Sequence, residues 1–129
     1  MKKENIITLP KDAVEIAESM ILDEHKEHFI GLYLSARNTL KKRELISLGT
    51  LNTSLVHPRE TFRPAIVSHA AGIIVLHNHP SGGTEPSESD VELTKRLQQA
   101  GKILGIDLID HIVFCANGEF YSFKDKNAM

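Results

Sequence analysis

The sequence of 129 residues contains a single cysteine, Cys115. One cysteine excludes an intrachain disulfide and any zinc finger built from several thiolates, and it suits a reducing compartment. Long apolar runs are also absent, because the longest, residues 70–76, is far shorter than the roughly 20 residues that span a bilayer. The first residues lead into no signal-type apolar core. We therefore expect a cytoplasmic protein without a membrane segment.

An excess of charge of one sign is lacking as well. Fifteen Lys and Arg residues oppose 17 Asp and Glu residues, so the formal net charge is −2. This balance offers no general attraction to nucleic acid or to an anionic membrane, although a local basic patch stays open. Hydrophobic residues make up 41% and charged residues 25%, as is typical of a globular protein. Because no repeat or linker divides the sequence, we expect one domain over residues 1–129.

The spacing of apolar residues predicts a mixture of helices and strands. The expected helices cover residues 12 to about 24, residues 58–71 with Pro64 delaying or kinking the helix, and a later stretch whose core face is Leu93, Leu97, Ala100 and Leu104. The expected strands cover residues 28–34 and 40–48 as a hairpin, then 72–79, 107–115 and 120–123. The strand 72–79 is apolar on both faces and therefore central. This order predicts an α/β fold with helices packed against a mixed sheet.

The segment from residue 77 to residue 90 carries the chemistry. Side chains alternate between the faces of a strand, so His77 and His79 point the same way at the end of the expected central strand. A loop rich in glycine and proline follows, and Asp90 falls in the first turn of the next helix. Two imidazoles and a carboxylate are the three-ligand set of a catalytic zinc, with the fourth position left for water.

Each of these residues also has a structural interpretation. Ser87-x-x-Asp90 fits a helix capping box, which is the favoured interpretation of that pair taken alone. A single histidine at a strand end is more often hydrogen-bonded structure than a ligand. Two histidines on the same face of the strand, together with an aspartate at the start of the next helix, favour a metal site. The capping box is compatible with that site.

The spacing H-x-H, seven residues, S-x-x-D resembles the JAMM (MPN-type) metalloprotease motif. The wider sequence, over about residues 27–123, resembles the bacterial RadC family. The strings that carry this resemblance are Gly49-Thr50-Leu51, His57-Pro58-Arg59-Glu60, His77-Asn78-His79-Pro80-Ser81-Gly82, Pro86-Ser87 and Leu108-Ile109-Asp110-His111. The resemblance implies the JAMM/MPN fold, a mixed sheet sandwiched by helices that is similar to the fold of cytidine deaminases.

The same resemblance implies a zinc site and a hydrolytic activity. It makes His77, His79 and Asp90 the ligands of Zn2+, and it makes Ser87 the residue that holds the bound water or the developing oxyanion. Zinc lowers the pKa of water toward ~7 and polarises a carbonyl, which suits this role. The implied reaction is hydrolysis of a peptide or isopeptide bond in an unknown protein or peptide substrate.

A general base is also needed to move the proton of the water. JAMM proteins use a glutamate from an early strand, and Glu27 is the best match by position, just before the expected strand 28–34. Glu27 equally fits a solvated, charged helix end. Glu60 is the rival, because it can reach inward from the start of the second helix, and Glu44 and Glu24 follow behind both.

The remaining polar residues favour structural roles. His57 and Arg59 can bind a substrate carboxylate but suit the surface better. His111, in an apolar strand, is expected to be a satisfied core histidine or one that supports a ligand. His69 is expected on a helix face without a part in the chemistry, and Cys115 is expected to be a buried small hydrophobe.

Two alternatives to a hydrolase stay open. The RadC family is historically linked to DNA repair, but the helix-hairpin-helix region that often precedes this domain is missing from the sequence, and the net charge is slightly negative. A non-catalytic binding module is the second alternative. Relatives of that kind typically lack the histidines or the acid, whereas both are present here. The sequence does not indicate an oligomeric state.

Overall fold

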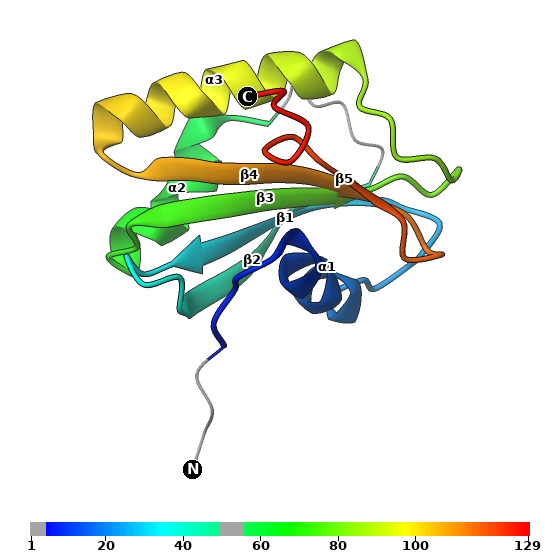
Figure 1. The fold of residues 1–129 in the computed structure, drawn as a ribbon, viewed down its shortest axis with the longest axis horizontal. Helices are drawn as coiled ribbons and strands as arrows, with labels where there is room; N and C mark the ends of the chain where they lie inside the picture. Colours follow the sequence, from blue (N-terminus) through cyan, green and yellow to red (C-terminus); the bar gives the residue numbers. More distant parts are fainter. Residues whose placement is uncertain (1–4, 50–55) are drawn as a thin grey trace.

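The computed structural model describes residues 5–49 and 56–129, so Thr50 and Leu51 of the RadC-like strings lie outside the described part. Within it, five strands form one mixed sheet in the order β2-β1-β3-β4-β5 (Figure 1). The strands are β1 (Glu27–Leu34), β2 (Leu40–Gly49), β3 (Gly72–Asn78), β4 (Asp107–Phe114) and β5 (Phe120–Ser122). The helices are α1 (Pro10–Ser19), α2 (Pro58–Val67) and α3 (Glu88–Leu104). The expected mixed sheet and the β1–β2 hairpin are confirmed.

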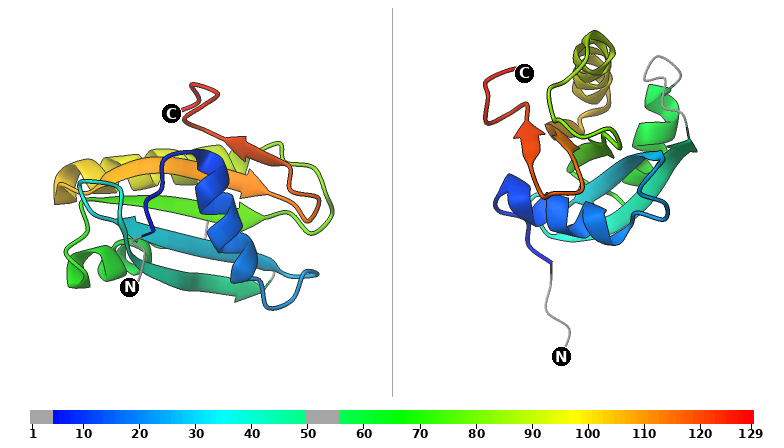
Figure 2. Two further views of the ribbon diagram at one scale, coloured as in Figure 1. Left: turned by 60° about the horizontal axis from the view of Figure 1, so that its bottom comes forward. Right: turned by 90° about the vertical axis from the view of Figure 1, so that its right-hand side faces the viewer.

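Helices cover both faces of the sheet, as Figure 2 shows, with α1 on one side and α2 and α3 on the other. Alternation along β1 explains this arrangement, because successive side chains enter opposite cores. Phe29 and Tyr33 pack with residues of α2 and α3, whereas Ile30 and Leu32 pack with residues of α1. Every residue of β3 is buried, as expected for a central strand covered on both faces.

The sheet topology places the end of β3 beside the start of α3. Strand β3 pairs antiparallel with β1 and parallel with β4, and α3 forms the crossover between the two parallel strands. Helix α3 ends at Leu104, and the next residue, Gly105, has a positive φ of 73° that gives the left-handed turn leading into β4. The loop between β3 and α3 therefore lies at one edge of the layered structure, where residues 77–90 come together (Figure 1).

The predicted end of the first helix is wrong. Helix α1 ends at Ser19, not near Glu24, and the Ser19 hydroxyl donates to the carbonyl of Ile16 at 2.6 Å. The N–H of Leu22 then donates to His28 Nε2 at 3.0 Å, so the chain has already left the helix. Met20 and Ile21 nevertheless pack against the core on the α1 side, which is why the apolar spacing extends past the helix.

The second helix is also shorter than expected, although its start is correct. Helix α2 begins at Pro58 and runs through Pro64 to Val67, so Pro64 does not delay it. His69 adopts a positive φ of 57° after the helix end, and it lies exposed there rather than on a helix face. In α3, Leu93 and Leu97 are buried as expected, but Leu104 is 47% exposed because the helix ends at that residue.

No helix among residues 5–49 and 56–129 is both long enough and apolar enough to cross a membrane.

Candidate metal centre

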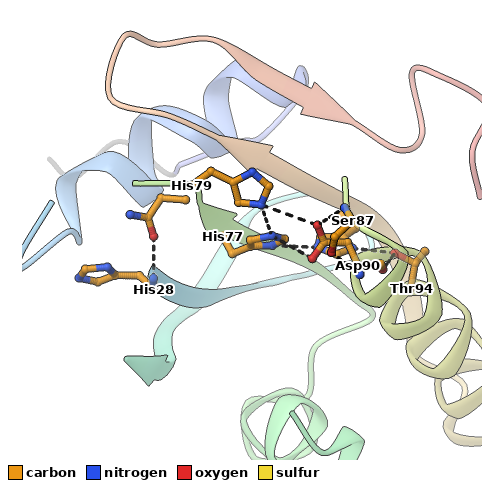
Figure 3. Close-up of polar contacts among 8 residues, drawn as sticks. His28, His77, His79, Ser87, Asp90 and Thr94 are labelled. Atoms are coloured by element: carbon orange, nitrogen blue, oxygen red, sulfur yellow. Dashed lines mark hydrogen bonds and ion pairs between the residues drawn. The ribbon is translucent and has the colours of Figure 1, made fainter. Parts of the chain in front are cut away.

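The loop after β3 returns the chain so that His77, His79 and Asp90 converge (Figure 3). Helix α3 starts with a capping box, in which the N–H of Asp90 donates to Ser87 Oγ at 3.1 Å and the N–H of Ser87 donates to Asp90 Oδ2 at 2.8 Å. The predicted cap is therefore confirmed. Because Asp90 closes this box, its carboxylate is held against the end of β3.

The spacing of the ligand atoms fits a metal ion. The Nε2 atoms of His77 and His79 lie 3.1 Å apart. His77 Nε2 lies 3.1 Å from Asp90 Oδ1, and His79 Nε2 lies 3.7 Å from Asp90 Oδ2. Tetrahedral zinc with bonds of about 2.0–2.1 Å has ligand atoms roughly 3.3–3.4 Å apart, so these three side chains can hold such an ion.

Charge at the cluster is set by the pairing of Asp90 with the two imidazoles. Burial acts to raise the pKa of the Asp90 carboxyl, but hydrogen bonds to His77 and His79 outweigh it and hold that pKa well below its usual range. Hydrogen bonding to Asp90 raises the pKa of His79 against the effect of partial burial. Asp90 is therefore an anion at neutral pH, as a metal ligand must be.

His111 lies behind His77, on the neighbouring strand β4. It is fully buried, as expected, and its Nε2 lies 3.1 Å from His77 Nδ1. Its Nδ1 lies 2.6 Å from the hydroxyl of Thr94 in α3. Burial, with a smaller contribution from His77, lowers the pKa of His111 to about 3. His111 is a satisfied core histidine that contacts a candidate ligand.

Glu27 begins β1 on the face that carries the cluster. Phe29 pairs with His77 across the two strands, and alternation puts Glu27 on the same face as Phe29. The charge of Glu27 contributes to the raised pKa of His79. Glu27 also lines a cavity of about 290 Å³ together with Gly49, Pro80 and three neighbouring residues. Glu27 therefore shares a sheet face with His77 and is near enough to His79 for its charge to act there.

The rival glutamates lie elsewhere. Glu60 is exposed in the first turn of α2 and borders an apolar cavity with Phe62 and Leu104, at the far end of α3 from Asp90. Glu44 lies on β2, where Lys42 is 3.8 Å away. Glu24 is exposed and borders a separate cavity of about 190 Å³ that also touches His79. Of these carboxylates, Glu27 is the best placed to act at the cluster.

Comparison with known proteins agrees with the fold. The family model of the RadC-like JAB domain matches residues 7–128. The chain belongs to this family. Its sequence is 49% identical to a UPF0758 protein of Desulforamulus reducens over 94% of this chain and 53% of that protein. The identity is 46% to a UPF0758 protein of Shouchella clausii, with 94% of this chain and 52% of the relative covered.

A UPF0758 protein of Methanosarcina mazei is 43% identical over 93% of this chain and 52% of its own length. The chain therefore spans about half the length of the curated relatives it matches. The RadC resemblance and the expected JAB/MPN fold, which is of the metallohydrolase type, are both confirmed.

Several side chains of this JAB domain lie apart from the cluster. His57 is the exposed N-cap residue of α2, and Arg59 is exposed beside it, as the surface interpretation expects. Cys115 is buried, and its thiol donates to Asn117 Oδ1 at 2.7 Å. None of these three side chains is hydrogen-bonded to His77, His79 or Asp90 in the described part of the chain, although Cys115 lines a cavity that His79 also lines.

One residue of the JAB domain that the sequence pattern does not indicate, Asn78, supports the backbone around Glu27. Asn78 Oδ1 accepts a hydrogen bond from the N–H of His28 at 2.6 Å, and Asn78 Nδ2 donates to the carbonyl of Lys26 at 2.9 Å. The amide therefore binds the backbone on both sides of Glu27. Alternation turns Asn78 away from the histidines that flank it, so the motif spacing gave no sign of this contact.

Proposed function

We propose that this JAB domain is a zinc-dependent hydrolase that cleaves peptide or isopeptide bonds with an activated water. The observation that carries the proposal is the convergence of one nitrogen each from His77 and His79 and one oxygen of Asp90, all within 4.8 Å of one another, which suits three corners of a tetrahedral zinc site. Three protein ligands leave the fourth corner for water or substrate, as catalytic zinc sites do.

The residues around the cluster supply the steps of the reaction. Zinc, when bound, polarises the amide carbonyl and lowers the pKa of water toward about 7. The Glu27 carboxylate takes the proton of the attacking water and returns it to the leaving amine. The Ser87 oxygen accepts from the N–H of Asp90, so its own O–H remains able to donate to the negative charge that develops on the carbonyl oxygen.

The substrate partner that we propose is a protein or peptide, and the compartment is the cytoplasm. Cys115, the single cysteine, is buried as a free thiol, which is consistent with a reducing environment.

Metal content tests the ligand assignment. Inductively coupled plasma mass spectrometry on protein purified without added metal is expected to give about one zinc per chain, and much less for His77→Ala and Asp90→Ala. His57→Ala is the matched control, because this histidine is exposed on α2, and it is expected to retain the metal. A zinc content far below one in the unmodified protein, or an undiminished content in the first two variants, contradicts the proposal.

Substitution of the glutamate tests the chemistry separately. Glu27→Gln is expected to keep zinc and to abolish cleavage of a synthetic peptide mixture followed by mass spectrometry. Glu60→Gln, on the exposed surface of α2, is expected to keep both. Equal cleavage by the unmodified protein and Glu27→Gln removes Glu27 from the role of general base.

A further inference from the structure

A hydrogen-bonded chain runs behind the metal cluster, through the interior of the protein. His111 Nε2 lies 3.1 Å from His77 Nδ1, and His111 Nδ1 lies 2.6 Å from Thr94 Oγ1. The Thr94 hydroxyl donates to the backbone carbonyl of Asp90 at 3.0 Å. His111 is 0% exposed and Thr94 is 2% exposed, so no competing water reaches these bonds from the surface. The chain connects His77 on β3 with Asp90 on α3.

The direction of each hydrogen bond follows from the last acceptor of the series, the backbone carbonyl of Asp90. A carbonyl only accepts, so the single hydroxyl hydrogen of Thr94 is used on Asp90. Thr94 Oγ1 must then accept from His111, which places a hydrogen on His111 Nδ1. A neutral imidazole has one hydrogen, so His111 Nε2 accepts from His77 Nδ1–H. A hydrogen on Nδ1 leaves the Nε2 lone pair of a neutral His77 for a metal ion, in place of the hydrogen bond to Asp90 that the geometry without an ion allows.

The surroundings of His111 keep it neutral. Its ring stacks on Phe123 with centroids 4.7 Å apart, and Phe29 approaches it edge-on at 6.5 Å. Both of its nitrogens are bonded to neutral groups. A buried imidazolium without an adjacent anion is costly, so the polarity derived above is the one that the site favours.

We propose that His111 and Thr94 are positioning residues that fix His77 as an Nε2 ligand and join it to the turn of α3 that carries Asp90. The inference rests on the proposed metal centre, and it assigns to these two residues the preorganisation of two of its three ligands. Hydrogen-bond partners of ligating histidines typically contribute 10–100-fold to metal affinity. His79, which is partly exposed, is not part of this series of hydrogen bonds.

Zinc affinity, measured by competition with a chromophoric chelator, tests the inference without reference to turnover. Thr94→Val removes the hydroxyl with little change of shape and is expected to weaken zinc binding about 10–100-fold. Thr94→Ser restores the hydroxyl and is expected to restore affinity to near that of the unmodified protein. Thr61→Val is the matched control, since Thr61 is equally buried and also donates to the carbonyl four residues before it. It is expected to leave affinity unchanged.

The imidazole tautomers give a second test that needs no variant. Long-range ¹H–¹⁵N spectra of the zinc-bound protein are expected to show His77 and His111 each protonated at Nδ1. A different tautomer at His111, or a Thr94→Val variant that binds zinc as tightly as the unmodified protein, overturns the inference while the proposed function stands. Failure of the unmodified protein to bind zinc contradicts the proposed function and, with it, this inference.

Discussion

Asn78 lies between two candidate ligands in the sequence, but its side chain binds the backbone at the start of the neighbouring strand β1. Its amide is the partner of the His28 N–H and of the Lys26 carbonyl. The Lys26 carbonyl also lies 2.9 Å from His28 Nδ1, so it keeps a partner if Asn78 is truncated, whereas the buried N–H of His28 loses the contact. The start of β1, and with it the backbone of Glu27, therefore depends on one side chain.

Truncation of the Asn78 side chain is expected to destabilise the folded protein. Asn78→Ala should lower the free energy of unfolding by about 1–3 kcal/mol, because it leaves a buried N–H without its acceptor. Urea unfolding followed by circular dichroism measures the change. Gln99→Ala, exposed on α3, is the control and should change the free energy by less than about 0.5 kcal/mol. Equal stability of the two variants would show that the amide does not hold the start of β1.

Asp110 gives the protein a pH dependence away from the cluster. Burial raises the pKa of this carboxyl above its usual value, in spite of hydrogen bonds from the Ser122 hydroxyl and the N–H of Lys124. A raised folded-state pKa means that the folded protein binds the proton more tightly than the unfolded chain. Stability is therefore lost as the pH rises from about 4 through the folded-state pKa.

Asp110→Asn removes this ionisation and keeps an oxygen for the backbone donors. The stability of the variant relative to the unmodified protein is expected to increase with pH over that window, by about 1.4 kcal/mol for each unit by which the folded-state pKa exceeds its ordinary value. Urea unfolding of metal-free protein at pH 4 and at pH 7 measures the trend. A difference that stays constant or shrinks between the two pH values would contradict the assignment.

At the level of elements, the sequence predicted the strands better than the helix ends. Strand β3 and the β1–β2 hairpin were predicted within one residue at each end, because apolar runs there coincide with glycine and polar breaks. Helices α1 and α2 end early because Met20, Ile21 and Ala70 remain packed in the core after the backbone has turned. Apolar spacing records burial, and burial continues past the last helical residue.

In the candidate site, too, the sequence predicted some features and not others. Motif spacing predicted that His77, His79 and Asp90 meet, and the structure brings them together, while their roles as ligands stay a prediction. The contacts of His111 with His77 and of Asn78 with His28 join residues 34 and 50 positions apart. Such contacts depend on which strands become neighbours, so no local pattern could indicate them.

The N-cap of α3 gives a prediction about the stability of this helix. Ser87→Ala removes the oxygen that accepts from the N–H of Asp90, and it is expected to lower the free energy of unfolding of metal-free protein by about 0.5–2 kcal/mol. Thermal or urea unfolding in the presence of a chelator measures this effect apart from any catalytic role. Ser89→Ala, exposed in the first turn of α3, is the control, and a loss as large as that of Ser87→Ala would argue against a cap at Ser87.

At the level of the whole molecule, the charge balance bears on the DNA-associated alternative. With a net charge of −2, the chain is expected to show no salt-dependent binding to a labelled DNA duplex in fluorescence anisotropy. A basic protein of similar size, measured in parallel, establishes that the assay detects binding. Affinity that rises steeply as salt is lowered would favour a nucleic-acid function for this chain.

The three ligand-bearing residues belong to one short stretch of chain, from the end of β3 to the first turn of α3. A cation held by all of them cross-links the two ends of that stretch, and closing so short a loop costs little chain entropy. A ligand that binds only the folded state stabilises that state by mass action. The stabilisation against local opening is greatest in the loop that the cation closes. Amide hydrogen exchange in residues 80–89 should therefore slow on zinc addition far more than exchange in the middle of β2, an edge strand that carries none of the three ligands.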